Sequence, residues 1–218
     1  MKFFLDSANL DQIQEANDLG IIDGVTTNPS LMAKESIKGK EGFRNHYLKI
    51  CNIVSGDVSA EVISTDFTGM VREAEELAGL HSQIVVKIPC IKDGIKAIKY
   101  LSSKGVRINC TLIFSPGQAL LAAKAGTTYA SPFVGRLDDI STDGIALVEQ
   151  IVNIYQTYNF NSQVIASSIR HTMHIIQSLE AGAHVATCPL NSILGLLKHP
   201  LTDLGLEKFL ADYKKLNG

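Results

Sequence analysis

The sequence lacks any apolar run long enough to cross a membrane, and its first residues do not resemble a signal peptide. No stretch approaches the roughly 18 apolar residues of a spanning helix. At the N-terminus only three apolar residues, 3–5, precede Asp6. The four cysteines show no CxxC or zinc-like spacing, which is typical of free thiols in a reducing cytosol. We therefore expect a cytoplasmic protein that does not associate with a membrane.

The sequence also lacks a charge excess of either sign. Its 20 Lys and Arg nearly balance its 22 Asp and Glu, for a net charge of −2, which argues against nucleic acid as a partner. The six histidines are scattered and form no cluster with carboxylates, so we expect neither a metal site nor another cofactor. Small anionic substrates remain compatible with this composition, because they need only a local basic pocket.

What the sequence does contain is a regular alternation of short apolar runs with longer amphipathic segments. Strand–helix alternation implies parallel strands with helical crossovers. Eight such units in 218 residues predict an α/β protein with a single (β/α)8 TIM barrel over residues 1–218. An open doubly wound sheet is the alternative, but no GxGxxG motif opens a helix. We expect strands at 3–5, 24–28, 58–62, 84–89, 106–111, 128–131, 163–166 and 184–187. We expect helices at 9–16, 30–54, 66–80, 93–103, 115–125, 143–158, 170–181 and from 189, with an extra C-terminal helix at about 204–216.

One of these strands, residues 84–89, holds a single lysine among apolar residues and ends in proline. Such a β-branched run is typical of a strand buried on both faces. A buried ammonium group loses hydration, which favours the neutral amine, and a neutral lysine in a pocket attacks carbonyls to form Schiff bases. The alternative is a lysine at the end of an edge strand, with its head group in water.

Each expected strand ends in a polar residue, and barrel enzymes carry their chemistry at the carboxyl ends of their strands. Because side chains alternate across a strand, residues two apart share a face. This predicts that several of these polar residues point into the barrel together. The alternate positions are mostly apolar, as helix-facing positions should be; they are Leu5, Ala60, Val86, Cys110 and Ala130. The strand-ending residues are Asp6, Asn28, Glu61, Lys87, Thr111, Ser131, Ser168 and Thr187. The predicted inward pairs are Phe4 with Asp6, Ser59 with Glu61, Val85 with Lys87, Asn109 with Thr111, Tyr129 with Ser131, and Ala166 with Ser168.

This convergence assigns roles to the residues at the predicted mouth of the barrel. Lys87 would be the nucleophile, with Asp6 and Glu61 as general acid and base for the proton transfers of imine chemistry. Thr111 and Asn109 would hold a water molecule or substrate hydroxyls.

Two arginines follow late strands and would face the same mouth. Arginine suits bidentate binding of phosphate, and barrel phosphate sites are often built from late loops. Simpler interpretations remain open. Arg136 could pair with Asp138 or Asp139, Arg170 could be solvated in the first turn of a helix, and Asp6 could cap a helix.

Six motifs spread over nearly the whole chain are similar to those of one known family. They are Phe4-Leu5-Asp6-Ser7-Ala8-Asn9, Gly24-Val25-Thr26-Thr27-Asn28-Pro29-Ser30, Val86-Lys87-Ile88-Pro89, Ile108-Asn109-Cys110-Thr111-Leu112-Ile113-Phe114-Ser115, Ser131-Pro132-Phe133-Val134-Gly135-Arg136 and Ala166-Ser167-Ser168-Ile169-Arg170. Together they resemble the transaldolase family and, by the length of the chain, its small group that includes the fructose 6-phosphate aldolases.

The resemblance implies a class I aldolase-type barrel that works through a Schiff base without a metal ion. It implies that Lys87 forms the imine, that Asp6 takes the proton from the C4 hydroxyl, and that Glu61 and Thr111 position a water molecule. As substrate-binding residues it implies Thr27, Asn28, Asn109, Ser131, Phe133, Arg136, Ser168 and Arg170; among these, Arg136, Ser168 and Arg170 bind the phosphate.

Two positions separate the branches that the resemblance allows. In the aldolase branch a glutamine and a tyrosine are usual at these two positions. This chain has Glu61 and Phe133 there and so resembles the transaldolases. A carboxylate relays protons that a carboxamide cannot. The leading hypothesis is therefore a transaldolase of the pentose phosphate pathway. It would move dihydroxyacetone from fructose 6-phosphate or sedoheptulose 7-phosphate to erythrose 4-phosphate or glyceraldehyde 3-phosphate. The alternatives are an aldolase that releases free dihydroxyacetone and, more remotely, a non-catalytic sugar-phosphate-binding barrel. The chain departs from the family pattern at Ile169, where an aromatic is usual, and at His171.

The resemblance also implies a homo-oligomer, since small members of the group form decamers of two pentameric rings. The expected C-terminal helix carries Leu206, Phe209, Leu210 and Tyr213 at helical spacing. This apolar stripe would pack either on a neighbouring subunit or on the barrel of its own chain.

Overall fold

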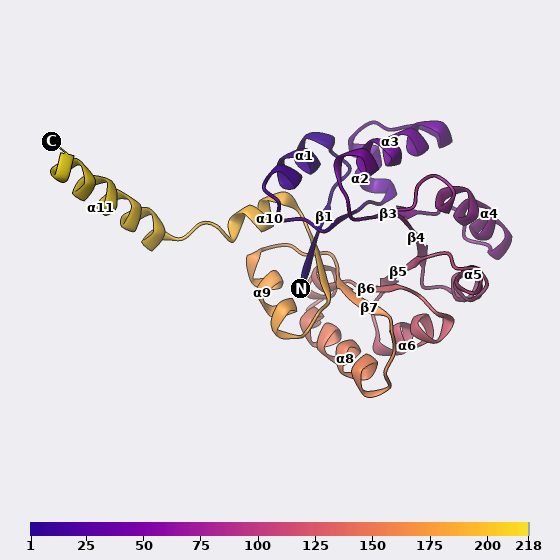
Figure 1. Ribbon diagram of the computed structural model, residues 1–218. Helices are drawn as coiled ribbons and strands as arrows, with labels where there is room; N and C mark the ends of the chain where they lie inside the picture. Colours follow the sequence, from indigo (N-terminus) through magenta and orange to yellow (C-terminus); the bar gives the residue numbers. More distant parts are fainter. Residues whose placement is uncertain (218) are drawn as a thin grey trace.

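The eight apolar runs form eight parallel strands that pair in chain order and close into a barrel, as the computed structural model shows for residues 1–217 (Figure 1). The predicted (β/α)8 architecture is therefore confirmed. Each strand pairs with its two neighbours in the chain, and β1 also pairs with β8 to close the sheet. The strands are β1 (Lys2–Asp6), β2 (Gly24–Thr26), β3 (Asp57–Glu61), β4 (Ile84–Pro89), β5 (Ile108–Ile113), β6 (Tyr129–Pro132), β7 (Gln163–Ala166) and β8 (Val185–Cys188).

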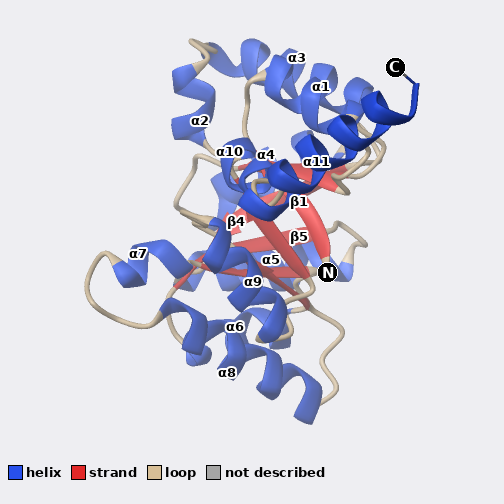
Figure 2. Cartoon of the chain, turned by 90° about the vertical axis from the view of Figure 1, so that its left-hand side faces the viewer, coloured by secondary structure: helices blue, strands red, loops and turns tan. Residues whose placement is uncertain are grey.

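Helices enclose the strands, as the view turned by 90° shows (Figure 2). They are α1 (Leu10–Asp18), α2 (Pro29–Lys34), α3 (Gly39–Ile53), α4 (Phe67–Ala78), α5 (Lys92–Ser103), α6 (Pro116–Ala125), α7 (Val134–Asp138), α8 (Gly144–Thr157), α9 (Thr172–Glu180), α10 (Leu190–Gly195) and α11 (Pro200–Asn217).

The helices around the barrel differ from the prediction in three main places. The long helix expected at 30–54 is two helices, α2 and α3, because Ser36 and Gly39 adopt left-handed conformations with φ of 57° and 69°. The short helix α7 was not expected at all. The helix α9 begins at Thr172, capped by His171, so Arg170 lies in the loop before the helix and not in its first turn.

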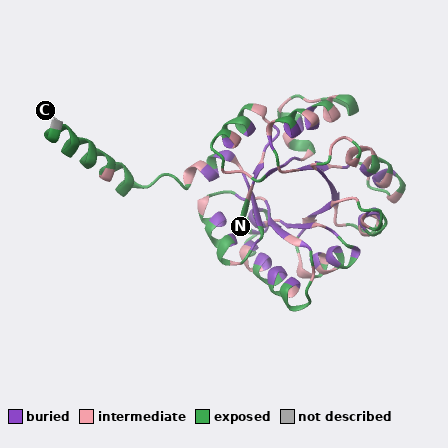
Figure 3. Cartoon of the chain, viewed as in Figure 1, coloured by how far each residue is buried: buried purple, intermediate pink, exposed green. Residues whose placement is uncertain are grey.

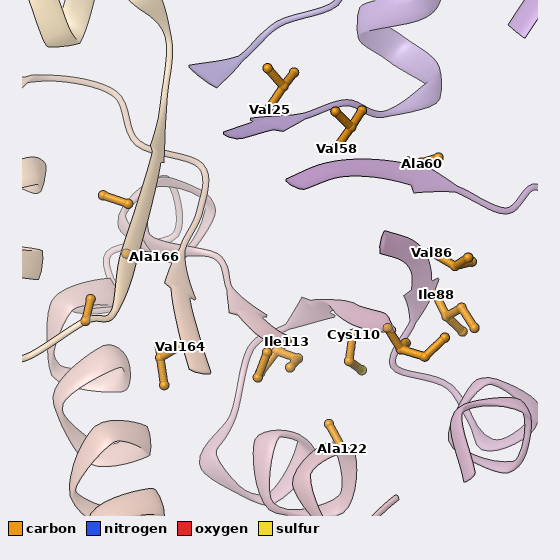
Figure 4. Packing of buried hydrophobic residues seen from close by; sticks show 14 of the residues in the cluster. Val25, Val58, Ala60, Val86, Ile88, Cys110, Ile113, Ala122, Val164 and Ala166 are labelled. Atoms are coloured by element: carbon orange, nitrogen blue, oxygen red, sulfur yellow. The ribbon is translucent and has the colours of Figure 1, made fainter. Parts of the chain in front are cut away.

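Two separate sets of buried side chains stabilise the barrel. The larger set fills the layer between strands and helices. Figure 4 shows Val86 and Ile88 pointing outward from β4, and Cys110 and Ile113 pointing from β5 toward Ala122 of α6. The smaller set consists of residues that point into the barrel and alternate along the strands with residues of the larger set. They are Phe4, Val85, Tyr129, Ile165 and Val185. The alternation of a two-faced strand therefore separates the outer packing from the barrel interior.

The amino-terminal end of the barrel is closed by packing and by an ionic contact. The rings of Phe4 and Tyr129 meet edge to face with centroids 5.9 Å apart. The hydroxyl of Tyr129 donates to Asp57 at 2.8 Å, and the Arg107 guanidinium pairs with the same carboxylate at 2.5 Å. Burial and the Asp57 carboxylate raise the pKa of Tyr129 well above its usual value, which keeps the hydroxyl protonated as a donor. The interior is thus filled at this end, and only the opposite end is available for a ligand.

The helix α11 extends away from the barrel, and its residues from 200 to 216 are exposed apart from Gly205 (Figures 1 and 3). It begins at Pro200, four residues before the expected start. Its apolar residues face solvent, with Phe209 72% and Leu210 53% exposed. Among the described helices, none is both long enough and apolar enough to cross a membrane.

Gly24 is the position in β2 where the interior has no room for a side chain. A Cβ there would lie 2.6 Å from the carbonyl oxygen of Asp57 and 2.8 Å from the ring of Phe4.

We expect Gly24→Ala to lower the free energy of unfolding by about 1–3 kcal/mol through overpacking, as measured by urea denaturation. The matched control is Gly42→Ala in α3, where a Cβ would meet only Ile37 at 3.6 Å. Helix propensity predicts that this variant is stabilised by up to about 1 kcal/mol. Equal stability of Gly24→Ala and the wild type would contradict the packing described here.

Candidate active site

The carboxyl ends of the strands surround a mouth cavity of about 100 Å³ that brings together most of the predicted site residues. Polar side chains from seven of the eight strands or their following loops reach it, which is the convergence that inward parity predicts. Of the predicted residues, Asp6, Asn28, Lys87, Asn109, Ser131, Phe133, Arg136 and Ser168 line this mouth cavity, together with Thr26, Ser167 and Thr187.

Lys87 lies in this mouth cavity as a buried cation with two partners. Its side chain is 7% exposed. The Nζ atom lies 3.1 Å from Oε2 of Glu61 and donates to the carbonyl oxygen of Thr27, also at 3.1 Å. The pairing of β3 with β4 sets Glu61 directly beside Lys87. A closed barrel has no edge strand, so the alternative of a solvated lysine at a sheet edge does not apply here. A buried charge is tolerated only when it is paired and hydrogen-bonded, and both conditions hold.

Glu61 stands between the mouth cavity and a second cavity. Its side chain is 14% exposed. It lines a space of about 400 Å³ between α3 and α4, whose walls include Phe43, Tyr47 and Leu77. Burial raises the pKa of Tyr47, while hydrogen bonds from the Thr27 side chain and the Glu61 backbone act in the opposite direction. The carboxylate that pairs with Lys87 therefore lies between the mouth cavity and the space between α3 and α4.

Asp6 is held at the mouth by a short chain of hydroxyl groups. Thr26 donates to Oδ1 of Asp6 at 2.8 Å, and the hydroxyls of Thr26 and Thr187 lie 2.5 Å apart. Since Thr26 has a single proton to donate, Thr187 must donate to Thr26. Burial raises the pKa of Asp6, although the Lys87 charge and the Thr26 hydrogen bond act to lower it. Such a carboxylate is a stronger base once ionised. It does not cap α1, because Asn9 fills that role by accepting from the amide of Gln12.

A buried hydrogen-bonded row fixes Asn109 on the opposite side of the mouth. Ser131 donates to Oδ1 of Asn109 at 2.7 Å, and Nδ2 of Asn109 donates to Ser59 at 3.2 Å. The amide is thus fixed in one orientation, and the lone pairs of the Ser131 hydroxyl remain available to accept from a ligand.

Asn28 is oriented by a different device, since its side chain caps α2. Its Oδ1 accepts from the amide of Leu31 at 2.9 Å, with Pro29 in the first turn, where proline is tolerated. The cap occupies the oxygen of Asn28, so its NH₂ group is the part that can donate into the mouth cavity.

Thr111 has a buried hydroxyl for which no hydrogen-bond partner exists among the described residues. The residue is 1% exposed and lies on β5. Pairing of β5 with β6 becomes irregular just after it, because Leu112 has a left-handed φ of 59°. Unpaired buried hydroxyls are costly and rare in native proteins, and an ordered water molecule commonly satisfies them.

Thr27 does not line the mouth cavity as expected, and the neighbouring Thr26 does so instead. The hydroxyl of Thr27 donates to the backbone of Ser59 at 2.9 Å, and this side chain is not among those lining the mouth cavity. Its carbonyl oxygen, rather than its side chain, contacts Lys87. The strand β2 ends at Thr26, so Thr26 shares the inward face with Gly24 and occupies the position at the mouth.

The predicted inward pair of Ala166 with Ser168 is wrong. Ala166 belongs to the outer layer between strands and helices (Figure 4). Ile165 is the inward residue, since it belongs to the smaller set. The strand β7 ends at Ala166, and Ser168 adopts a left-handed φ of 59°. This turn of the backbone brings Ser168 back to the mouth cavity although strand parity would point it away.

Gly135 forms a close contact with the loop after β7. Its amide donates to the carbonyl oxygen of Ser168 at 3.0 Å. A Cβ on Gly135 would lie 2.4 Å from that oxygen and 2.6 Å from Nε of Arg170. The absence of a side chain at 135 therefore lets the segments that carry Arg136, Ser168 and Arg170 approach each other.

The two arginines are placed differently. Arg136 lies over the ring of Phe133, 4.8 Å from its centroid, and faces both the mouth cavity and a wider outer chamber of about 500 Å³. Arg170 lines only the outer chamber, and its guanidinium pairs with Asp139 at 2.6 Å. The simpler alternative, in which Arg136 pairs with Asp138 or Asp139, is not found among the described residues.

Two histidines that follow Arg170 in the chain, His171 and His174, contact each other, and His174 also contacts the backbone of Arg170. The rings of His171 and His174 stack with centroids 3.8 Å apart. His174 lies 2.8 Å from Asp138, and the amide of Arg170 donates to its Nδ1 at 3.3 Å. Burial lowers the pKa of His174, with the neighbouring His171 acting in the same direction. His171, a departure from the family pattern, is thus the cap of α9 rather than a residue of the mouth.

Four residues at the site were not among the predicted site residues. Thr26 was assigned to a longer strand, and Ser167 lies beyond the end of β7. Thr187 had a usable signal, since it ends a strand and shares the inward face with Val185. Gly135 gave no signal in the sequence, because its role depends on a contact with a residue 33 positions further along the chain.

Comparisons with known proteins agree with this geometry. A sequence model described as Transaldolase/Fructose-6-phosphate aldolase matches residues 3–218. A protein named probable transaldolase from Phocaeicola vulgatus is 71% identical over 218 residues, covering both chains completely. Proteins of the same name from Parabacteroides distasonis and Cytophaga hutchinsonii are 71% and 66% identical, again over both full lengths.

The raised pKa of Asp6 predicts a pH-dependent effect on stability. Above that pKa the native state carries the cost of a buried carboxylate, and as pH falls through it the native state takes up a proton and gains stability relative to the unfolded chain. We expect Asp6→Asn to raise Tm at pH 7, and the gain to shrink with falling pH and to vanish where the carboxyl is protonated in both states.

The measurement is a series of thermal unfolding curves from pH 7 to pH 3, with Asp11→Asn on the exposed face of α1 as the control for loss of one negative charge. A Tm difference for Asp6→Asn that stays constant with pH would refute the assignment.

Proposed function

The chain belongs to the transaldolase/fructose-6-phosphate aldolase family and functions as a transaldolase, a transferase, and we propose that it does so through a Schiff base on Lys87. One observation carries the mechanism: Nζ of Lys87 is buried at the mouth of the barrel, 3.1 Å from Oε2 of Glu61. A carboxylate at this distance can accept the proton of the ammonium group, which leaves the amine as a nucleophile.

The first half of the reaction loads the enzyme. Lys87 attacks the C2 carbonyl of the ketose phosphate, and Glu61 passes a proton to the resulting hydroxyl, which leaves as water when the imine forms. Thr111, with its unpartnered hydroxyl, holds that water beside Glu61. Asp6 then takes the proton of the C4 hydroxyl as the C3–C4 bond breaks. The aldose phosphate leaves, and the electron pair of the broken bond remains as an enamine on Lys87.

The second half reverses these steps with a new aldose phosphate. The enamine carbon attacks the aldehyde, Asp6 returns its proton to the new hydroxyl, and water hydrolyses the imine to free Lys87. The carboxylate of Glu61 supports this cycle because it can both give and take the proton. The three groups fixed around the mouth, Asn28, Asn109 and Ser131, have free donor or acceptor capacity for the dihydroxyacetone hydroxyls.

The phosphate of either sugar phosphate would lie at the outer end of the site. Arg136 faces both the mouth cavity and the outer chamber, and Ser168 and Arg170 complete the wall. Guanidinium groups suit phosphate oxygens. The ketose phosphate that donates dihydroxyacetone and the aldose phosphate that accepts it both carry the phosphate at the end distant from the reacting carbon. One phosphate site therefore serves both sugars. The substrates are those of the leading hypothesis, which places the reaction in the pentose phosphate pathway.

We also propose that the enzyme works in the cytoplasm as a homo-oligomer. All four cysteines are free thiols, which fits a reducing compartment. The helix α11 extends from its own barrel with Phe209 and Leu210 exposed (Figure 3). Exposed apolar faces of this kind are typical of interfaces. A second copy of the chain would cover the face, in a decamer of two pentameric rings.

The function is tested by turnover of fructose 6-phosphate with and without erythrose 4-phosphate, with glyceraldehyde 3-phosphate detected by a coupled assay. We expect sustained turnover only when the acceptor is present, because the enamine stays on Lys87 until an aldehyde arrives. Equal turnover without the acceptor would identify an aldolase that releases dihydroxyacetone.

The control variant is Lys87→Met, which keeps the length of the side chain but lacks the amine. It should lose turnover, and its mass should not change when borohydride is added with fructose 6-phosphate, whereas the wild type should gain a covalently attached sugar, because the variant has no imine to reduce. A wild-type protein that binds the sugar phosphate, shows no turnover with or without an acceptor, and gains no covalent adduct with borohydride would be a binding barrel.

The proposed assembly is tested by light scattering on a sizing column. We expect the wild type to run as a multiple of the 23.6 kDa chain and the double variant Phe209→Ser, Leu210→Ser to run as a smaller species. The control is Glu207→Gln, an exposed residue of the same helix. A wild type of 23.6 kDa, or a double variant of unchanged mass, would rule out this role of α11.

A further inference from the structure

The outer chamber has a second wall that the proposed mechanism does not use. The mouth cavity and the outer chamber adjoin each other, since Asp6, Asn28, Arg136 and Ser168 line both. One wall of the chamber carries the arginines after β6 and β7. The opposite wall is built from the loop after β1 and from α2, and it includes Lys34 at the end of α2.

The cations of this chamber differ in how far their charge is neutralised. Arg170 already pairs with Asp139 at 2.6 Å. For Arg136 and Lys34, no carboxylate lies within ion-pair distance anywhere in the part of the chain that the structure describes. Two carboxylates line the chamber, those of Asp6 and Glu35. Glu35 accepts a hydrogen bond from Asn9 at 3.1 Å. The two cations without an acidic partner therefore belong to facing walls of the same chamber.

Lys34 is also electrostatically linked to the reacting end of the site. Its charge acts on Asp6, whose pKa it tends to lower against the larger effect of burial. This interaction indicates that the charge of Lys34 is felt inside the chamber and is not directed entirely to solvent. An anion held between Arg136 and Lys34 would lie beside the mouth, in line with Asp6 and Asn28.

We propose that Lys34 binds the phosphate group of the sugar-phosphate substrates from the wall opposite Arg136, and thereby selects phosphorylated over unphosphorylated sugars. The inference rests on the proposed function for the identity of the substrates. A phosphate dianion is not neutralised by one guanidinium. Lysine supplies a mobile point charge with three donors, which can close over a phosphate that Arg136 and Ser168 have already positioned.

The test compares Lys34→Met with Lys38→Met. Lys38 is an exposed lysine four residues further on that lines neither cavity, so its loss controls for the change in net charge. With fructose 6-phosphate as the donor, the acceptor is either glyceraldehyde 3-phosphate or unphosphorylated glyceraldehyde. We expect Lys34→Met to lower kcat/KM for the phosphorylated acceptor by about 10- to 100-fold, the usual worth of a hydrogen bond to a charged group, and to leave kcat/KM for glyceraldehyde within about twofold.

A second readout does not depend on turnover. Inorganic phosphate is titrated by calorimetry into the wild type and both variants, and we expect its Kd to rise about tenfold or more in Lys34→Met alone. Loss of activity toward both acceptors by the same factor, or unchanged preference and unchanged phosphate Kd, would overturn the proposal. A wild type that binds phosphate through Lys34 but transfers no dihydroxyacetone would instead refute the proposed function and leave the phosphate-binding role intact.

Discussion

A positive charge buried at the mouth of a closed barrel needs a partner within the barrel, and the site depends on that requirement. Lys87 meets it through Glu61 and the carbonyl oxygen of Thr27, both at 3.1 Å. The register of β3 against β4 places Glu61 beside Lys87, so a shift of one residue would turn the carboxylate toward the helices. The pairing of β3 with β4 therefore also sets the position of Glu61 relative to Lys87, on which the proposed chemistry depends. Removing Glu61 would leave a buried ammonium group without its counter-ion, which is far more costly than losing an exposed ion pair.

The inward side chains of the barrel differ with depth: apolar packing lies at the amino-terminal end and polar side chains lie at the carboxyl ends of the strands. At the amino-terminal end, Phe4 and Tyr129 fill the interior and Asp57 ties Tyr129 to Arg107. Toward the carboxyl ends the same inward faces carry polar residues that satisfy one another in short rows, such as Ser131, Asn109 and Ser59. Preorganised rows of this kind hold donors and acceptors in place before the substrate arrives, so little reorganisation is needed during the reaction.

Much of the site followed from alternation along the strands. In five of the six inward pairs both residues lie within the strand, where parity holds. Lys87, Asp6, Asn109 and Ser131 all reach the mouth cavity. Parity failed at Ser168, where a left-handed residue after the end of the strand redirects the chain. It was of no help at Thr26, because the end of a three-residue strand cannot be located from composition alone. Contacts between distant segments, such as that of Gly135 with Ser168, leave no local pattern.

The left-handed turn at Ser168 has a consequence for engineering of this enzyme. Few residues other than glycine and asparagine tolerate such a φ, and the contact with Gly135 admits no side chain on the facing loop. The end of the site proposed to bind the phosphate is therefore framed by main chain, while its charges come from side chains attached to that frame. Libraries that aim at neutral aldehydes should keep the frame unchanged and diversify the cationic side chains, because changes to the frame would reshape the mouth and the chemistry with it.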